Sequence, residues 1–171
     1  MKAKNPSQSY TLLTDIVLPS ETNSLNHMFG GELLARMDRA ASIAARRHCN
    51  EIVVTASVNH VSFEQPIPLD SVVSVSAKVS RAFKTSMEVV LEVWLEDPKH
   101  LTKIQANKAI YTFVAVDENK RPVAVPPIEP ETEEEIKDFN AALRRKQLSL
   151  VLSGRMLAKD ATELKALFFK K

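Results

Sequence analysis

Apolar and polar residues alternate along two central segments of the chain. Residues 71–80 put valine or alanine on one face and serine or lysine on the other, and residues 88–96 put Val89, Leu91, Val93 and Leu95 opposite three glutamates. Alternation with one polar face is typical of antiparallel strands whose sheet is covered on one side. We therefore predict two neighbouring strands here, each with one buried face.

Three further segments have the composition of strands. Residues 10–18 are short and apolar and stop at Pro19, and residues 52–63 are rich in valine. Residues 104–116 form a segment long enough to be bent or bulged. Together the five segments predict a roughly five-stranded antiparallel sheet.

One long helix lies between the first and second strands. It opens at Gly30 and Gly31 and ends near residue 50, where an asparagine suits a left-handed cap. Leu34, Asp38, Ala41 and Ala45 are spaced to share one face, whereas Arg36 and the other arginines lie mostly on the opposite side. An acid on the packing face is costly, so we interpret Asp38 as a residue kept for chemistry. The two glycines let a substrate oxygen approach the unpaired amides of the first turn.

A helix against such a sheet predicts an α+β fold in which the sheet wraps the helix. One helix is a modest cover for so much sheet, so we expect a second subunit at an exposed edge or face. We expect the main domain to span residues 8–127. Residues 128–171 should form a proline-rich connector, a helix over 133–150 that starts in a Thr132–Glu135 capping box, and a basic tail.

Composition and charge narrow the range of possible functions. A net charge of +2 gives no sign of nucleic-acid binding, and one cysteine forbids an internal disulfide. No secretory signal or apolar run of about 20 residues is present, so we expect a cytoplasmic protein without a membrane span. No serine-hydrolase elbow and no metal-ligand spacing occurs, and Cys49 at a helix C-terminus is a poor nucleophile.

Several motifs together carry a family resemblance. They are Asn23, Met28-Phe-Gly-Gly31, Met37-Asp38, Ala45-Arg-Arg-His-Cys-Asn50, Val54-Thr-Ala-Ser-Val58, Phe63 and Thr85-Ser-Met-Glu88. In this order the chain resembles the hotdog-fold acyl-CoA thioesterases over residues 9–147, and within them the cytosolic acyl-CoA hydrolases. The resemblance implies a hotdog fold with one central helix, and hydrolysis of acyl-CoA to free fatty acid and coenzyme A.

The resemblance also assigns roles to residues of this chain. It places the catalytic acid at Asp38, a catalytic asparagine at Asn23 and the oxyanion-binding amide at Gly30 and Gly31. It places Thr85 and Ser86 near coenzyme A, where Arg81 and Lys84 are candidates for binding its phosphates. It implies no metal and no cofactor apart from coenzyme A as part of the substrate, and it implies homodimers that often group into hexamers.

Helix geometry independently points to a shared site. Gly30 and Asp38 are about 12 Å apart along one helix axis, too far for both to act on one thioester. We therefore expect two antiparallel helices from paired subunits to complete the site. Gly31 N–H would bind the carbonyl oxygen, Asp38 would activate water, and Asn23 would orient the water or thioester. Direct attack by Asp38, giving a mixed anhydride, stays open.

Two other functions remain as alternatives. One is a hotdog hydratase or dehydratase, which usually needs a histidine near the helix, where His27 is the only candidate. The other is a non-catalytic protein that binds or senses acyl-CoA in the same pocket. The acyl chain length is left undetermined by the sequence.

Overall fold

The computed structural model describes residues 1–59, 61, 63, 65–97 and 102–168. The chain divides into two compact units, Met1–Ile128 and Glu129–Lys171. The first unit contains the central helix and the whole sheet, and the second contains the C-terminal helices.

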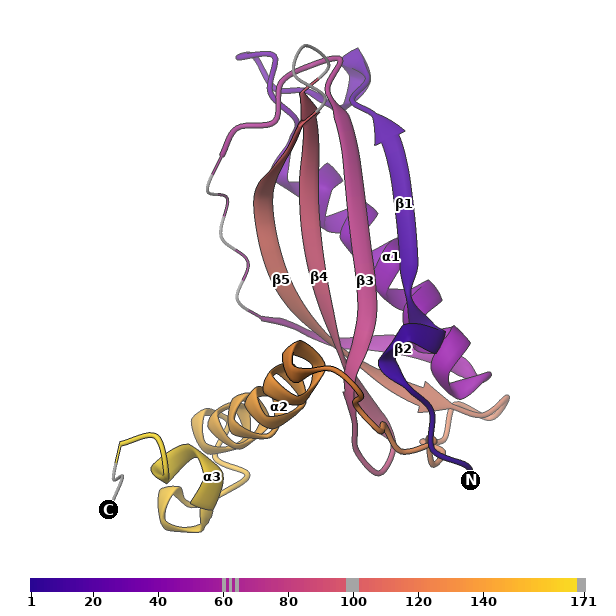
Figure 1. The fold of residues 1–171 in the computed structure, drawn as a ribbon, viewed down its shortest axis with the longest axis vertical. Coiled ribbons are helices and arrows are strands. Elements are labelled where there is room, and N and C mark those ends of the chain that lie inside the picture. The colour runs from indigo at the N-terminus through magenta and orange to yellow at the C-terminus, as the bar shows by residue number, and fades with distance from the viewer. Residues whose placement is uncertain (60, 62, 64, 98–101, 169–171) are drawn as a thin grey trace. The chain divides into compact units, whose positions relative to one another are not determined.

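The first unit is built on a five-stranded antiparallel sheet in the order β1-β3-β4-β5-β2, so that β1 and β2 form its two edges (Figure 1). The strands are β1 Thr11–Ile16, β2 Ile52–Asn59, β3 Val72–Ala82, β4 Ser86–Asp97 and β5 Thr102–Val116. The sequence predicted the second strand to reach residue 63, but β2 ends at Asn59. Residues 60 and 62 lie outside the described part of the chain.

Alternation correctly predicted which side chains enter the core. Val75 and Val79 of β3 and Val89, Leu91 and Val93 of β4 are almost completely buried. The expected irregularity in the last strand is confirmed, because Val93 pairs with residue 107 and residue 94 with residue 105, which leaves one extra residue in β5. The polar faces are not exposed throughout, although the alternation predicted that they would be. Ser74, Ser80 and Glu88 are only 1%, 2% and 4% exposed, and Glu88 accepts a 2.7 Å hydrogen bond from the Ser80 hydroxyl.

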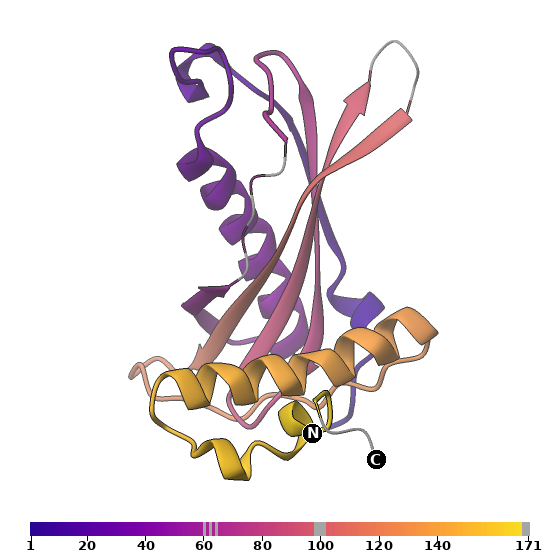
Figure 2. The ribbon, with the colours of Figure 1, turned by 90° about the vertical axis from the view of Figure 1, so that its left-hand side faces the viewer.

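Helix α1, Gly30–Cys49, lies along one face of the curved sheet (Figure 2). Ala40, Ala41, Ala44 and Ala45 are fully buried, and their small side chains allow the helix to approach the strands closely. Asn50 ends the helix in the predicted left-handed conformation, with φ of 57° and its N–H bonded to Arg46. The alanines thus pack the helix against the strands, and Asn50 ends it.

Arg36 does not face solvent as the spacing predicted. Its side chain is only 6% exposed, and Nη2 donates to the Glu21 carboxylate at 2.7 Å and to the Ile16 carbonyl at 2.9 Å. Glu21 ends the short 3₁₀ turn η2, Pro19–Glu21, which follows β1. The ion pair therefore ties α1 to the segment that leads into its own N-terminal loop.

The end of α1 is also fastened to the proline-rich segment. His48 is fully buried, and its Nε2–H donates to the Pro126 carbonyl at 2.7 Å. Lys4 donates through Nζ to the His48 carbonyl at 2.6 Å, and its backbone pairs with Ile128. These contacts attach the connector, as far as residue 128, to the first unit.

The second unit is helical. Helix α2, Glu133–Leu152, begins with the predicted capping box, in which the Thr132 hydroxyl accepts from the Glu135 N–H at 3.2 Å. The tail that follows contains the 3₁₀ turn η3, Ala158–Asp160, and the short helix α3, Thr162–Lys165. Gln147 holds α3 by accepting from the Leu164 N–H at 2.9 Å. Residues 169–171 at the end of the basic tail lie outside the described residues. Within the described residues, no helix has the length and apolarity to cross a membrane.

Candidate active site

The N-terminus of α1 exposes one of its two glycines. Phe29 occupies the N-cap and supplies no side-chain hydrogen bond, so the first amides are not capped from that position. A Cβ at Gly31 would meet nothing within 4 Å, whereas a Cβ at Gly30 would come within 3.0 Å of the Phe63 ring. The aromatic ring thus covers Gly30, and the open approach to the helix terminus lies at Gly31.

The loop before α1 holds Asn23 by its amide oxygen. Oδ1 accepts from the N–H groups of Leu25 at 2.9 Å and His27 at 3.2 Å, and Asn26 turns the loop with φ of 56°. The Nδ2 hydrogens bind no acceptor among the described residues. Asn23 is therefore positioned by its oxygen and left with two hydrogens to donate to a ligand.

The Arg36 ion pair sets the start of this loop. Arg36 and then the Leu18 N–H lower the pKa of the Glu21 carboxylate, which stays ionised at neutral pH. The Glu21 carbonyl in turn accepts from the Phe29 N–H at 2.8 Å, across the base of the loop. One buried arginine thereby connects the loop that carries Asn23 to the helix that carries Asp38.

Asp38 lies on the flank of α1 that faces the edge strand β2. Its side chain is half-buried rather than fully packed. The Thr55 hydroxyl of β2 donates to Asp38 Oδ1 at 2.8 Å, and Oδ2 has no partner among the described residues. One carboxylate oxygen is thus held in place while the other is free to accept a proton.

Tyr111 of β5 lies beneath the same turn of the helix. Its hydroxyl donates to the Leu34 carbonyl at 3.3 Å, and its side chain is buried. Burial first, and then the negative charge of Asp38, raise the pKa of Tyr111 to about 12. Tyr111 therefore keeps its proton at any pH at which a protein of this kind works.

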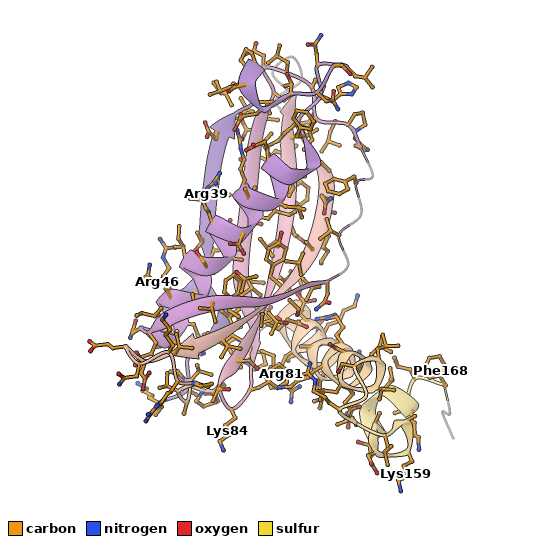
Figure 3. The ribbon with its side chains drawn as sticks, turned by 180° about the vertical axis from the view of Figure 1, so that it is seen from behind. Arg39, Arg46, Arg81, Lys84, Lys159 and Phe168 are labelled. Atoms are coloured by element: carbon orange, nitrogen blue, oxygen red, sulfur yellow. The ribbon has the colours of Figure 1, made fainter. Side chains whose placement is uncertain are left out.

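The residues proposed to bind coenzyme A lie elsewhere in the chain. Arg81 packs on the Phe83 ring, 5.7 Å from its centroid, and the Thr85 carbonyl accepts from Ala115 at 3.0 Å. Figure 3 shows Arg81 and Lys84 at the β3–β4 turn, beyond the Arg46 end of α1. Ser86 begins β4 at this turn. Within a single chain this basic turn therefore lies near the C-terminal end of α1, whereas Gly31 lies in the first turn of the helix (Figure 3).

Sequence reasoning gave no role to Thr55 or Tyr111. Thr55 stood in a motif that carried the resemblance, but threonine is an ordinary residue in a strand and its partner was not evident. Tyr111 occupied an apolar alternation, where only its hydroxyl was unusual. The structure gives no support to two other chemical possibilities, a cysteine nucleophile and a metal site. Burial raises the pKa of the Cys49 thiol, and no cluster of potential metal ligands occurs among the described residues.

Comparison with known proteins places this geometry in a family. The thioesterase superfamily profile matches residues 25–102. A Bacillus subtilis (strain 168) protein, named as the uncharacterized acyl-CoA thioester hydrolase YkhA, is 41% identical over 138 residues, which cover 81% of this chain and 80% of the relative. The chain therefore belongs to the thioesterase superfamily, and its fold is the predicted hotdog fold.

Two solved structures are similar over most of the chain. The acyl-CoA hydrolase of Staphylococcus aureus, in complex with butyryl coenzyme A, coenzyme A and coenzyme A disulfide, is 34% identical with a TM-score of 0.82, covering 96% of this chain and 99% of that one. An apo-hexameric acyl-CoA thioesterase is 35% identical with a TM-score of 0.82, covering 86% and 94%.

The S. aureus enzyme has also been solved as alanine variants of an asparagine, an aspartate and a threonine. In chain order these three positions lie 15 and 17 residues apart. The same two separations divide Asn23, Asp38 and Thr55 of this chain.

Proposed function

We propose that this protein hydrolyses acyl-CoA thioesters to a free carboxylic acid and coenzyme A. The observation that carries the proposal is the 2.8 Å hydrogen bond between Thr55 and Asp38. These two residues are as far apart along the chain as the aspartate and the threonine that were altered in the S. aureus hydrolase. A carboxylate with one oxygen held and one open is positioned and can still take a proton from water as a general base.

The chemical step uses water as the nucleophile. Asp38 Oδ2 takes a proton from a water molecule as its oxygen attacks the thioester carbonyl carbon. The carbonyl oxygen becomes negative and is stabilised by the Gly31 N–H at the positive end of the helix dipole. The C–S bond then breaks, and the coenzyme A thiolate receives the proton from Asp38. Asn23 donates from Nδ2 to the water or the carbonyl oxygen. Attack by Asp38 itself, through a mixed anhydride, leads to the same products.

The active site is assembled from two chains in this proposal. Asp38 lies about 10 Å along the helix from Gly31, at 1.5 Å per residue, so one chain cannot offer both to one carbonyl. β2 is an edge strand whose Ile52, Val54 and Val58 side chains are 48%, 48% and 46% exposed, which makes it a suitable edge for a second copy. An antiparallel partner helix would bring its Gly31 and Asn23 towards Asp38. The hexameric state of a similar thioesterase supports dimers grouped in threes.

The same arrangement gives the basic turn a function. Arg81 and Lys84 lie near the C-terminal end of α1 (Figure 3), and Thr85 and Ser86 follow them in the chain. An antiparallel partner would present its own α1 N-terminus towards this end. Coenzyme A bound across the dimer would then place its phosphates near Arg81 and Lys84. Gly30 contributes to the substrate site by leaving room for the Phe63 ring beside the oxyanion position.

We assign the activity to residues 8–127, since every proposed site residue lies within them, with residues 128–171 as an appended connector, helix and tail. A cytoplasmic location is proposed from relatives in rat and mouse that are named cytosolic acyl coenzyme A thioester hydrolases.

The direct test is thiol release from a panel of acyl-CoAs of increasing chain length. We expect turnover by the wild-type protein and a loss of about 10²–10⁴-fold in Asp38→Asn, without loss of fold. Glu118→Gln removes another carboxylate and is the matched control. Acyl-CoA binding without thiol release by the wild type would instead support a sensing protein. Consumption of an enoyl-CoA without thiol release would support a hydratase that uses His27.

A further inference from the structure

Tyr111 is a buried polar residue in a mostly apolar row. The inward-facing residues in this part of β5 are Asn107, Ala109, Tyr111, Phe113 and Ala115, and each is at most 2% exposed. A phenylalanine at position 111 would fill almost the same space without burying a hydroxyl, which is costly unless the hydroxyl is bonded. The hydroxyl therefore calls for an explanation beyond packing.

The hydroxyl contacts the turn of α1 that ends in Asp38. It donates to the Leu34 carbonyl at 3.3 Å, and in an α-helix that carbonyl also accepts from the N–H of Asp38, four residues later. A carbonyl oxygen has two lone pairs and can serve both donors. Because 3.3 Å is long for an O–H···O bond, we expect it to contribute little to the free energy of unfolding.

Thr55 and Tyr111 hold this turn from two paired strands. Thr55 of β2 lies opposite Phe113 of β5, and Val58 lies opposite Tyr111. The register shifts between Thr55 and Ser57, so that one extra residue of β2 lies between these two pairs. The bulge leaves Thr55 facing the helix, beside the aromatic residues Tyr111 and Phe113 of β5. One strand thus holds the carboxylate of Asp38, and the other holds the backbone beneath it.

We propose that Tyr111 is a positioning residue for Asp38, fixing the turn of α1 that presents the carboxylate by donating its hydroxyl to the Leu34 carbonyl. This inference rests on the proposed function, since it acts through the base of the hydrolysis. Burial, and then the charge of Asp38, keep Tyr111 protonated and therefore keep its hydroxyl a donor throughout the working pH range.

The test is Tyr111→Phe, with Tyr10→Phe as control. Tyr10, the chain's only other tyrosine, is 49% exposed. We expect Tyr111→Phe to lower kcat about tenfold and to leave KM within about twofold, because the base is displaced while substrate contacts remain. The urea unfolding midpoint should stay close to that of the wild type, and Tyr10→Phe should change none of these values.

The same substitution in an Asp38→Asn background separates positioning from a general structural role. Measured with enzyme in excess over acyl-CoA, Tyr111→Phe should cause no further loss once the base is gone. An unchanged kcat in the single variant, or an equal fold-loss in both backgrounds, would overturn the inference. Absence of thiol release from the wild type would instead defeat the proposed function, so the two failures are distinguishable.

Discussion

The Thr55 hydroxyl donates to one oxygen of the Asp38 carboxylate, across the gap between the edge strand and the central helix. This bond leaves a single carboxylate oxygen open, and it comes from the strand that we expect to meet a second subunit.

Thr55→Val keeps the shape of the side chain and removes its hydroxyl. We expect kcat to fall by about 10- to 100-fold, because the carboxylate loses the bond that orients it. Thr55→Ser retains a hydroxyl and should recover most of the activity. Equal activity of the valine variant and the wild type would show that Asp38 needs no such orientation.

Asn23→Asp distinguishes the role of the amide oxygen of Asn23 from that of its Nδ2 hydrogens. The aspartate keeps an oxygen for the N–H groups of Leu25 and His27 but has no hydrogens to donate. We expect it to lose at least about tenfold in kcat while its unfolding free energy stays near the wild-type value. Asn23→Ala should lose activity and also about 1 kcal/mol of stability. Normal turnover by Asn23→Asp would limit the residue to shaping the loop.

Mixing two inactive variants tests the shared site. A dimer of one Asn23→Ala and one Asp38→Ala subunit has one site with both lesions and one with neither. With random pairing and independent sites, about a quarter of wild-type turnover should return after subunit exchange. The exchange itself is verified by mass spectrometry with one isotope-labelled variant. No recovery despite exchange would place both residues in the same chain's site.

Arg81→Ala combined with Lys84→Ala tests the coenzyme A contact. Loss of two cations near the phosphates should raise KM for acyl-CoA several-fold with little change in kcat. Lys103→Ala removes a lysine paired with Glu96 and is the control. An unchanged KM in the double variant would mean that the β3–β4 turn does not contact the substrate.

His48 predicts how stability depends on pH. Burial lowers its pKa below the usual value, and its neutral ring donates to Pro126 while Nδ1 is buried without a partner among the described residues. The contribution of neutral His48 to the free energy of unfolding is therefore complete above the unfolded-state pKa of about 6.5. It is lost as the pH falls from there through the folded-state pKa. As the pH falls through this range, His48 should lower the wild-type free energy of unfolding, measured with urea, by at most about 1.4 kcal/mol per pH unit. His48→Gln should be less stable at pH 8 and show a smaller loss on acidification; an identical pH dependence would contradict this account.

The sequence by itself determined the order of the main elements and the buried faces of β3 and β4. Alternation predicts β3 and β4 because side chains on a strand point to opposite sides, and the capping residues Asn50 and Thr132 mark helix ends by local geometry. The separation of Gly30 and Asp38 along one helix followed from its constant rise. These properties depend on neighbours along the chain, and periodicity reports them directly.

The contacts around the candidate site depended on the tertiary structure. The burial of Arg36, the Phe63 ring over Gly30 and the convergence of Thr55 and Tyr111 on the turn that ends in Asp38 each join segments distant in sequence. Their geometry is set by strand order and by bulges such as the one after Thr55, and a single-residue change of register reverses which face a side chain occupies. Periodicity carries no record of such pairings, so only the folded chain shows which hydroxyl reaches the carboxylate.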